Sequence, residues 1–577
     1  MISSLSPIPS LPKPIGPHKV GTTEWEIPVS ELPSSSLSPD PKITTIKFRL
    51  FYPTMPTATS KVAVPWLPSP QRQWNEAYAS FLGASPKLSS IISILPFLIN
   101  FTNIPAVADS PLLPRSKSTK YPVVVFSHGL GGNYNTYSAV CASLASFGIV
   151  CVAPEHRDGS APVTLIRSAD GVETSIRYQR HPHTPTTKVF NSRNAQLRIR
   201  LWELEQLYAV LSRLNAGQTF SNYAVARRRP ARPPLVRDTL DLQPGRVTWV
   251  GHSFGGATIV QFIKSVYYHQ FLPSLQGTQY ENDPDWRPLS SPVLSSELVR
   301  QITPDSPVGL LDLWAMPLRA ELTKWLWEKP LPCYDRKPAP GTNNDHTTPN
   351  VVAIMTAEFY KHTELLIRMK AALSANPPEA IATLERQRDK SNQGWNAAET
   401  TALSTPPNKA SSETEVHGCA AEDTSDSDAE GFSLGSAISA STSPSSAPSR
   451  STSPSPSRGR NKTLSPSSST TSIVPSFSLS PTSLPTPPGP KLFLIPRSAH
   501  LSQSDFGLLF PKLTRYLMKA EQPKETIQLN VRAVLSVMRG AGLEIENYQN
   551  GLEEEQEDPI LTDRCNEERF VPLKLVE

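Results

Sequence analysis

The sequence contains few cysteines, and their spacing does not suggest a structural framework. Five cysteines occur among 577 residues, an odd number, and no two are arranged as Cys-x-x-Cys. A disulfide scaffold or a zinc site is therefore not expected, and a reducing compartment is the simpler interpretation. Cys141 and Cys151 lie in apolar surroundings, and we expect them to be ordinary core residues. The five are Cys141, Cys151, Cys333, Cys419 and Cys565.

Targeting signals and long apolar runs are also missing. The N-terminus, MISSLSPIPSLPKP, has no basic region followed by an apolar run, and position 2 is not the glycine that myristoylation requires. The longest apolar stretch, residues 88–107, is interrupted by proline and polar residues, whereas a membrane span needs about 20 mainly apolar residues. We interpret it as a core or cap helix, with a surface that dips into lipid as the alternative. The predicted location is cytoplasmic, with peripheral membrane contact under that alternative.

An excess of charge of one sign is absent as well. Lysine and arginine number 56 against 51 acidic residues, a net charge of +5, which is too weak a bias to indicate a nucleic-acid partner. Hydrophobic residues make up only 38% of the chain, whereas its 60 prolines are about twice the usual share of ~5%. Residues 391–488 are dominated by Ser, Thr and Pro. We predict that this segment is disordered, because it cannot bury enough apolar area to offset its chain entropy.

Elsewhere, short apolar runs alternate with helical patterns. The unbroken apolar runs are typical of strands buried on both faces. Their alternation with helices indicates a mainly parallel sheet with helices on both faces. Strands are predicted at residues 46–51, 123–126, 149–153, 247–250, 308–311, 351–355 and 492–495, and helices at 137–146, 195–214, 257–269, 319–328, 358–373 and 506–517.

A nucleophile motif follows one of these strands. Residues 246–256 read RVTWVGHSFGG, which places G-x-S-x-G between an apolar strand and an apolar helix. In such an elbow the flanking glycines permit a tight, strained turn that projects the serine hydroxyl above the sheet. Ser253 is therefore the predicted nucleophile. The predicted fold class is an α/β-hydrolase fold, with a long disordered insertion before the last strand.

The domain boundaries follow from this pattern. Ordered-looking sequence, KLFLIPRSAH, resumes after the Ser/Pro-rich segment, so that segment interrupts a domain, which loop entropy tolerates. We predict a flexible N-terminus at 1–15, the first part of the hydrolase domain at 16–390 and the insertion at 391–488. The second part of the domain follows at 489–547, and an acidic tail at 548–577.

A second glycine-rich turn supports the nucleophile. Residues 123–132 read VVVFSHGLGG, again a strand that runs into a loop. In this fold the loop supplies one backbone N–H to the oxyanion, and the residue after the nucleophile supplies the other. The predicted donors are Leu130 and Phe254, each worth about 3–4 kcal/mol of transition-state stabilisation. His128 lies nearby, and we expect it to shape the loop.

The base and the acid should follow the nucleophile in the chain. His500, in a loop directly after a predicted strand, is the best base. His269 lies on the helix after the elbow, and His362 lies on another helix. Two carboxylates remain open as the acid: Asp312 closes the strand PVGLLD, and Glu358 follows VVAIMTA at the commoner acid position. We favour Asp312 for its tighter apolar context, where a buried carboxylate holds the imidazole tautomer.

Several segments occur together in the order of a known family. They read GPHKVGTTEWEIPV, FRLFYPT, VPWLPSPQRQW, YPVVVFSHGLGG, APEHRDGSA, GHSFGG, LLDLWAMPL and SAHLSQSDF. This series resembles the platelet-activating-factor acetylhydrolases, the group VII-type phospholipases A2, over about residues 16–375 and 489–545. The resemblance implies Ser253, Asp312 and His500 as the triad and Leu130 and Phe254 as oxyanion donors. It also implies a calcium-independent reaction without a cofactor or metal.

The resemblance implies hydrolysis of the sn-2 acetyl or short, oxidised acyl ester of a phospholipid through an acyl-enzyme. The expected partner is thus a phospholipid or lipid ester. The insertion departs from the family pattern, and so do loops 160–193 and 217–244, which would shape the acyl pocket. One alternative is a general carboxylesterase on small or polymeric esters. Another is an inactive hydrolase scaffold with a phospho-regulated tail. Arg157 and Asp158 are predicted to form an ion pair behind the site.

Overall fold

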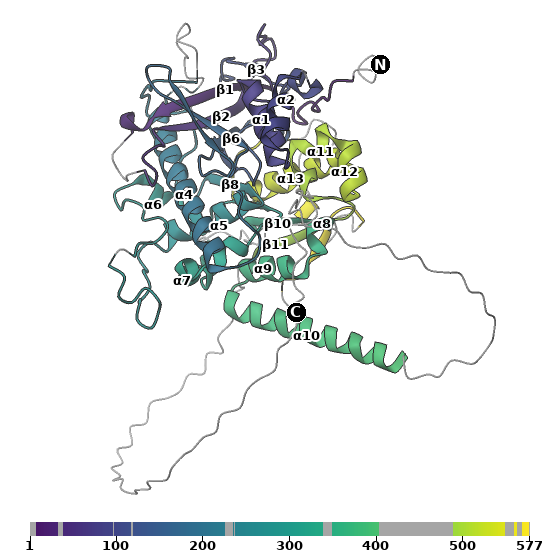
Figure 1. The fold of residues 1–577 in the computed structure, drawn as a ribbon. Helices are drawn as coiled ribbons and strands as arrows, with labels where there is room; N and C mark the ends of the chain where they lie inside the picture. Colours follow the sequence, from purple (N-terminus) through teal and green to yellow (C-terminus); the bar gives the residue numbers. More distant parts are fainter. Residues whose placement is uncertain are drawn as a thin grey trace, which may run out of the picture. The chain divides into compact units, whose positions relative to one another are not determined.

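One large, mainly parallel sheet runs through the molecule (Figure 1). The computed structural model describes residues 7–32, 38–95, 97–116, 119–224, 235, 237–284, 286–337, 349–402, 489–547, 559–561 and 568–575. Within them the strand order is β12-β11-β10-β9-β8-β4-β5-β2-β1-β3. The strands are β1 (Lys19–Pro28), β2 (Thr45–Thr54), β3 (Val107–Ala108), β4 (Val123–Ser127), β5 (Val150–Glu155), β8 (Val247–His252), β9 (Val308–Leu311), β10 (Val351–Thr356), β11 (Lys491–Ile495) and β12 (Val571–Leu573).

The parallel core of the sheet carries the predicted strands. Strands β5, β4, β8, β9, β10 and β11 are parallel neighbours, whereas β2 joins β5 in antiparallel fashion. All seven predicted strands are present. The sequence reading missed β1, β3 and β12 at the edges, and the separate hairpin of β6 (Val163–Arg167) and β7 (Glu173–Arg177).

Helices cover both faces of the sheet, as predicted. They are α1 (Gln71–Phe81), α2 (Pro86–Ile94), α3 (Ser138–Ala145), α4 (Thr187–Asn215), α5 (Phe254–Tyr267), α6 (Glu297–Gln301), α7 (Lys324–Trp327), α8 (Ala357–Tyr360), α9 (Thr363–Leu373), α10 (Pro377–Ala402), α11 (Asp505–Leu509), α12 (Pro511–Met518) and α13 (Pro523–Gly540). No helix of the described chain combines the length and the apolar character needed to cross a membrane.

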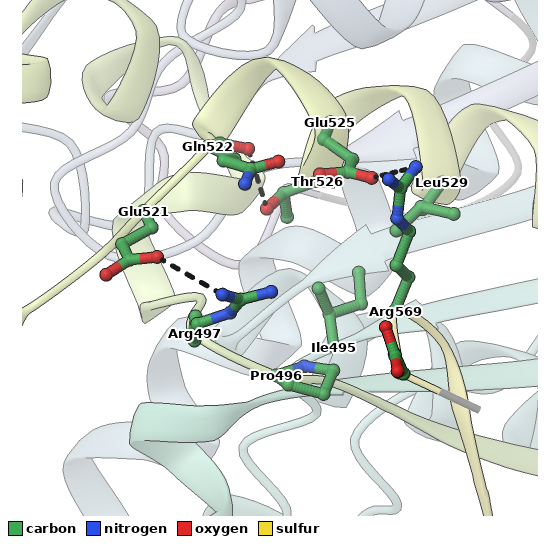
Figure 2. Close-up of a pocket in the computed structure, with 10 residues that line it drawn as sticks. Ile495, Pro496, Arg497, Glu521, Gln522, Glu525, Thr526, Leu529 and Arg569 are labelled. Carbon is green, nitrogen blue, oxygen red and sulfur yellow. Dashed lines mark hydrogen bonds and ion pairs between the residues drawn. The ribbon is translucent and has the colours of Figure 1, made fainter. Parts of the chain in front are cut away.

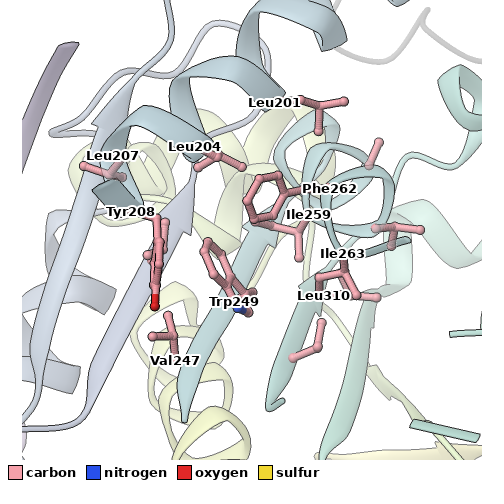
Figure 3. Packing of buried hydrophobic residues seen from close by; sticks show 14 of the residues in the cluster. Leu201, Leu204, Leu207, Tyr208, Val247, Trp249, Ile259, Phe262, Ile263 and Leu310 are labelled. Carbon is pink, nitrogen blue, oxygen red and sulfur yellow. The ribbon is translucent and has the colours of Figure 1, made fainter. Parts of the chain in front are cut away.

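The alternation of side chains along each strand divides the core into two layers. Val123 and Val125 of β4 pack with α4 and α5, whereas Val124 and Phe126 of the same strand pack with α3 and α13. Successive strand residues point to opposite faces, so each apolar strand serves both layers. Figure 3 shows the first layer, in which Trp249 of β8 lies among side chains of α4 and α5.

Three predicted helices are interrupted in the structure. Residues 319–328 form short 3-10 turns followed by α7, because the Thr323 hydroxyl bonds the carbonyls of Leu318 and Ala320 and competes with helical pairing. Residues 358–373 divide into α8 and α9 at His362, whose backbone is extended. Residues 506–517 divide before Pro511, because the residue preceding a proline is driven out of the helical region.

Described elements also lie at and beyond the predicted edges of the domain, which remain predictions. Helix α10 continues to Ala402, past the predicted boundary at residue 391, because Ser/Thr/Pro-rich composition begins only after that helix. Residues 403–488 lie outside the described part of the chain. Strand β11 is not the last one, since β12 pairs with it and Phe570 stacks on Phe493 with 4.3 Å between ring centroids. The predicted tail thus contributes an edge strand, and Leu11 of the predicted flexible N-terminus is buried.

Candidate active site

A sharp turn between β8 and α5 carries Ser253. Its backbone has φ 57° and ψ −118°, a strained conformation that non-glycine residues adopt rarely and mainly at functional sites. The glycines of the motif make the turn possible. A Cβ on Gly251 would lie 2.3 Å from the carbonyl oxygen of Gly255, and a Cβ on Gly255 would lie 2.1 Å from that of Ser127. Only glycine fits at either position.

Neighbouring strands bring Asp312 and His500 together. Asp312 follows β9 and is fully buried, with φ 41°. Its Oδ2 lies 2.9 Å from Nδ1 of His500, in the loop after β11. Both carboxylate oxygens also accept hydrogen bonds from Thr356, from its backbone N–H and its hydroxyl, at 2.7 Å each. This carboxylate is therefore oriented toward the imidazole by groups on the next strand.

Glu358, the other carboxylate predicted as a candidate acid, contacts a different part of His500. Its Oε2 accepts a hydrogen bond of 2.8 Å from the backbone N–H of His500. Burial raises the pKa of the Glu358 carboxyl, although the N–H of His500 acts in the opposite sense. Geometry thus gives Asp312 the imidazole contact and leaves Glu358 to hold the loop that carries the base.

Two aromatic groups enclose the imidazole of His500. The ring of Phe359 is stacked on it with 4.8 Å between centroids and 7° between planes. The ring of His252 lies on it at 4.4 Å. Burial, followed by the charge of His500, holds the pKa of His252 well below its usual value, so His252 adds no charge to the site. The sequence reading missed both contacts, although His252 lies inside the nucleophile motif.

The glycine-rich loop after β4 lies against the nucleophile. A Cβ on Gly129 would approach Cβ of Ser253 to 3.1 Å, so the backbone here passes close to the serine. Tyr137 ties this loop to the elbow: its hydroxyl accepts a bond from the N–H of Gly129 and lies 2.7 Å from Nδ1 of His252. Among the described residues, neither the N–H of Leu130 nor that of Phe254 has an acceptor. These two donors are thus available to a substrate oxygen.

His128 shapes this loop from inside the protein. Its Nδ1 lies 2.9 Å from the carbonyl oxygen of Gly129, and its Nε2 accepts a bond from the backbone N–H of His156. Burial, with a further contribution from Arg200, lowers the pKa of His128 to about 3. The neutral ring is fixed between two backbone segments, in keeping with the structural role expected for it.

The predicted ion pair between Arg157 and Asp158 does not form. Arg157 pairs with Glu26 of β1 at 3.2 Å, whereas Asp158 pairs with Arg200 of α4 at 2.7 Å. All four side chains are fully buried. Each of the two neighbours thus has its partner on a different element, Arg157 on β1 and Asp158 on α4.

A second serine–histidine–carboxylate set lies deeper in the protein. The hydroxyl of Ser127 lies 2.9 Å from Nε2 of His156, and Nδ1 of His156 lies 2.8 Å from Glu203. Burial lowers the pKa of His156 and raises that of Glu203, so this set is held neutral. Because all three side chains are sealed from solvent, it has the connectivity of a triad without access for a substrate.

One group of side chains has the composition of a metal site. Donor atoms of His252, Asp312 and His500 lie within 4.8 Å of one another. The Asp312 oxygens, however, already accept bonds from Thr356 and His500, and Nδ1 of His252 bonds Tyr137. These contacts are those of a hydrogen-bonded acid–base pair, so the group fits a metal poorly.

A charged cleft lies behind the loop that carries His500. Figure 2 shows Arg497 facing Glu521 and Arg569 facing Glu525, with separations of 3.8 and 3.1 Å. The arginines of the cleft are paired, and none of the predicted catalytic residues lines it. It is therefore distinct from the site at the elbow.

Strand order, the strained serine after β8, and the hydrogen-bonded acid–histidine pair after β9 and β11 define an α/β-hydrolase fold. Comparison with known proteins shows which hydrolases this chain is similar to. A model of the family described as "Platelet-activating factor acetylhydrolase, isoform II" matches residues 4–275. Residues 4–275 are thus similar to the platelet-activating factor acetylhydrolase family. This match includes Ser253 but ends before Asp312 and His500, whose pairing rests on the geometry alone.

Individual proteins are similar to this chain as well. The platelet-activating factor acetylhydrolase of Cavia porcellus is 30% identical over 256 residues, 44% of this chain and 52% of the relative. A putative phospholipase A2 of Schizosaccharomyces pombe is 26% identical over 270 residues, 43% of this chain and 58% of the relative. The chain thus spans about half the length of the curated relatives it matches. A ferulic acid esterase from Streptomyces cinnamoneus aligns over 45% of this chain and 59% of its own, with 19% identity and a TM-score of 0.28, too loosely to carry an argument.

Proposed function

We propose that this protein is a serine-dependent carboxylic ester hydrolase. The observation that carries the proposal is that a strained serine, a buried aspartate and the histidine bonded to it all follow the carboxyl ends of parallel strands. The N–H of Ser253 bonds the carbonyl of Leu311, and the N–H of Asp312 bonds that of Ile354. The ends of β8, β9 and β10 are thereby held together, which supports Ser253 and Asp312 as the proposed nucleophile and acid.

The contacts of His500 support the following proposed steps of the reaction. Because Nδ1 donates to Asp312, the other ring nitrogen is left as the base that removes the Ser253 proton. The alkoxide attacks the ester carbonyl, and the N–H groups of Leu130 and Phe254 hold the oxyanion. His500 returns the proton to the departing alcohol and then activates water to hydrolyse the acyl-enzyme. Asp312 stays ionised and stabilises the imidazolium.

The proposed substrate is a phospholipid with an acetyl or short, oxidised acyl group at sn-2. Similarity of the first half of the chain to proteins named platelet-activating factor acetylhydrolase supports this choice. A general carboxylesterase has the same machinery, so only a panel of substrates separates the two.

The deciding measurement is hydrolysis of three esters in the presence of EDTA: a 2-acetyl phospholipid, a long-chain phospholipid and p-nitrophenyl acetate. We expect rapid release of acetate from the acetyl lipid, little hydrolysis of the long-chain lipid and no effect of EDTA. Turnover of p-nitrophenyl acetate alone would replace the lipid substrate with a small ester. No turnover of any ester would overturn the proposed function and favour a non-catalytic scaffold.

The proposed lipid contact rests on a helix whose apolar side chains face solvent. Helix α2 buries Ser89 and Ser93 and turns Leu88, Ile91 and Ile94 to solvent. Of the core or cap helix predicted for residues 88–107, this exposed apolar face excludes the core position. A 3-10 turn at Leu98–Phe101 extends the same apolar surface. Contiguous apolar patches mark interaction sites on soluble proteins, and this one fits a membrane interface. Its exposed members are Leu88, Ile91, Ile94, Leu95, Phe97, Leu98 and Phe101.

Charge on this surface should abolish binding to lipid. We expect the protein to sediment with phosphatidylcholine vesicles, and the double variant I94E/F97E to remain in the supernatant, because burying a carboxylate in the acyl region is costly. Leu294, 74% exposed before α6, supplies the control: L294E should sediment like the parent chain. Turnover of p-nitrophenyl acetate should be unchanged in both variants. A parent chain that stays in solution, or equal losses in both variants, would remove the lipid surface.

A further inference from the structure

A buried arginine connects the two segments that carry the proposed oxyanion donors. Arg200 lies on α4 and is fully buried. Its guanidinium donates to the carbonyl oxygen of His128 at 2.9 Å, to the hydroxyl of Ser160 at 2.5 Å and to Oδ2 of Asp158 at 2.7 Å. One side chain on a long helix thus holds three points on two loops.

These contacts bracket Leu130 along the chain. On one side, the carbonyl of His128 is bonded directly to Arg200. On the other side, the N–H of Gly131 donates to the carbonyl of Ser160 at 2.8 Å, and the Ser160 hydroxyl is bonded to Arg200. The peptide that presents the Leu130 N–H therefore lies between two positions that are linked to Arg200, and His128 and Tyr137 hold Gly129 directly.

The same guanidinium contacts the other side of the proposed oxyanion hole. Its central carbon lies 4.5 Å from the centre of the Phe254 ring. It also donates to the hydroxyl of Thr258 at 3.3 Å, and that hydroxyl bonds the carbonyl of Phe254 at 2.9 Å. The first turn of α5, which presents the Phe254 N–H, is thereby tied to the loop that presents the Leu130 N–H.

We propose that Arg200 is a positioning residue for the oxyanion hole, which keeps the Leu130 and Phe254 N–H groups aimed at one point. The inference rests on the proposed ester hydrolysis. Asp158 balances the charge of Arg200, so the effect is mainly geometric. Because the donors meet full negative charge only in the transition state, displacing them lowers kcat far more than it raises KM.

The test compares kcat and KM of the variants R200K and R157K. The substrate is p-nitrophenyl acetate, and active sites are counted by titration with a fluorophosphonate. Arg157 is the matched control, since it is equally buried and pairs with the buried Glu26 but contacts neither donor segment. We expect R200K to lower kcat per titrated site about ten- to a hundred-fold, with KM changed less than about three-fold. The inhibition constant of a trifluoromethyl ketone, which mimics the oxyanion, should rise in parallel with the loss of kcat. R157K should lower Tm to a similar degree while keeping kcat per site within about two-fold.

A merely structural arginine would give a different result. It would reduce the number of titratable sites but leave kcat per site and ketone affinity unchanged, which would overturn the proposal. S160A removes the contact between Arg200 and the Ser160 hydroxyl without leaving an unpaired charge. If R200K fails to fold, S160A tests the role of Arg200 in its place. A parallel loss of kcat and ketone affinity in S160A supports the role of Arg200, and unchanged values refute it. Failure of the parent chain to hydrolyse any ester would instead refute the proposed function.

Discussion

Replacement of Ser253 by alanine should lower kcat by about 10⁶-fold, the cost of removing a serine nucleophile from an intact triad. The alanine variant keeps the fold, because the hydroxyl of Ser253 makes no hydrogen bond within the described chain. Turnover of p-nitrophenyl acetate and labelling by a fluorophosphonate measure the effect. Both should vanish together, since both need the same oxygen.

Ser127 provides a control that few hydrolases offer. It also contacts a histidine that is linked to a carboxylate, with 2.9 and 2.8 Å separations, but the set is sealed and held neutral. We expect S127A to retain one labelled site per chain and turnover of the same order as the parent. Labelling that survives in S253A and disappears in S127A would transfer the nucleophile to the buried set.

Replacement of Asp312 by asparagine should lower kcat about 10⁴-fold. The asparagine keeps the volume of the side chain but cannot stabilise the imidazolium, and its amide favours the wrong tautomer of His500. The measurement is kcat for p-nitrophenyl acetate across pH, because weaker stabilisation of the imidazolium changes the pH profile as well as the rate.

The matched control for the Asp312 variant is Glu358→Gln. Glutamine retains an oxygen that accepts the hydrogen bond from the N–H of His500, so we expect kcat to fall less than about ten-fold, in line with the modest net value of a single hydrogen bond. The opposite order, with the larger loss in E358Q, would make Glu358 the acid and remove Asp312 from that role.

Local patterns predicted the central part of this fold well. The seven apolar strands lie where the sequence places them, because a strand buried on both faces must be apolar throughout. The edge strand β12 was missed for the same reason, because it spans only Val571–Leu573 and its residues are at most partly buried. Helix boundaries were least predictable where a hydroxyl or a proline interrupts the pattern, as at Thr323 and Pro511.

The sequence by itself determined the elbow around Ser253, since the requirement for glycine at 251 and 255 is local and follows from the tight turn. Only the tertiary structure decided which carboxylate meets the imidazole of His500. Asp312 and Glu358 both follow apolar strands, but Asp312 contacts the imidazole and Glu358 contacts the backbone N–H. It also decided that Arg157 and Asp158 have separate partners, and that α2 turns its serines inward. In each case the outcome depends on what lies across from the side chain, and that neighbour comes from a distant part of the chain.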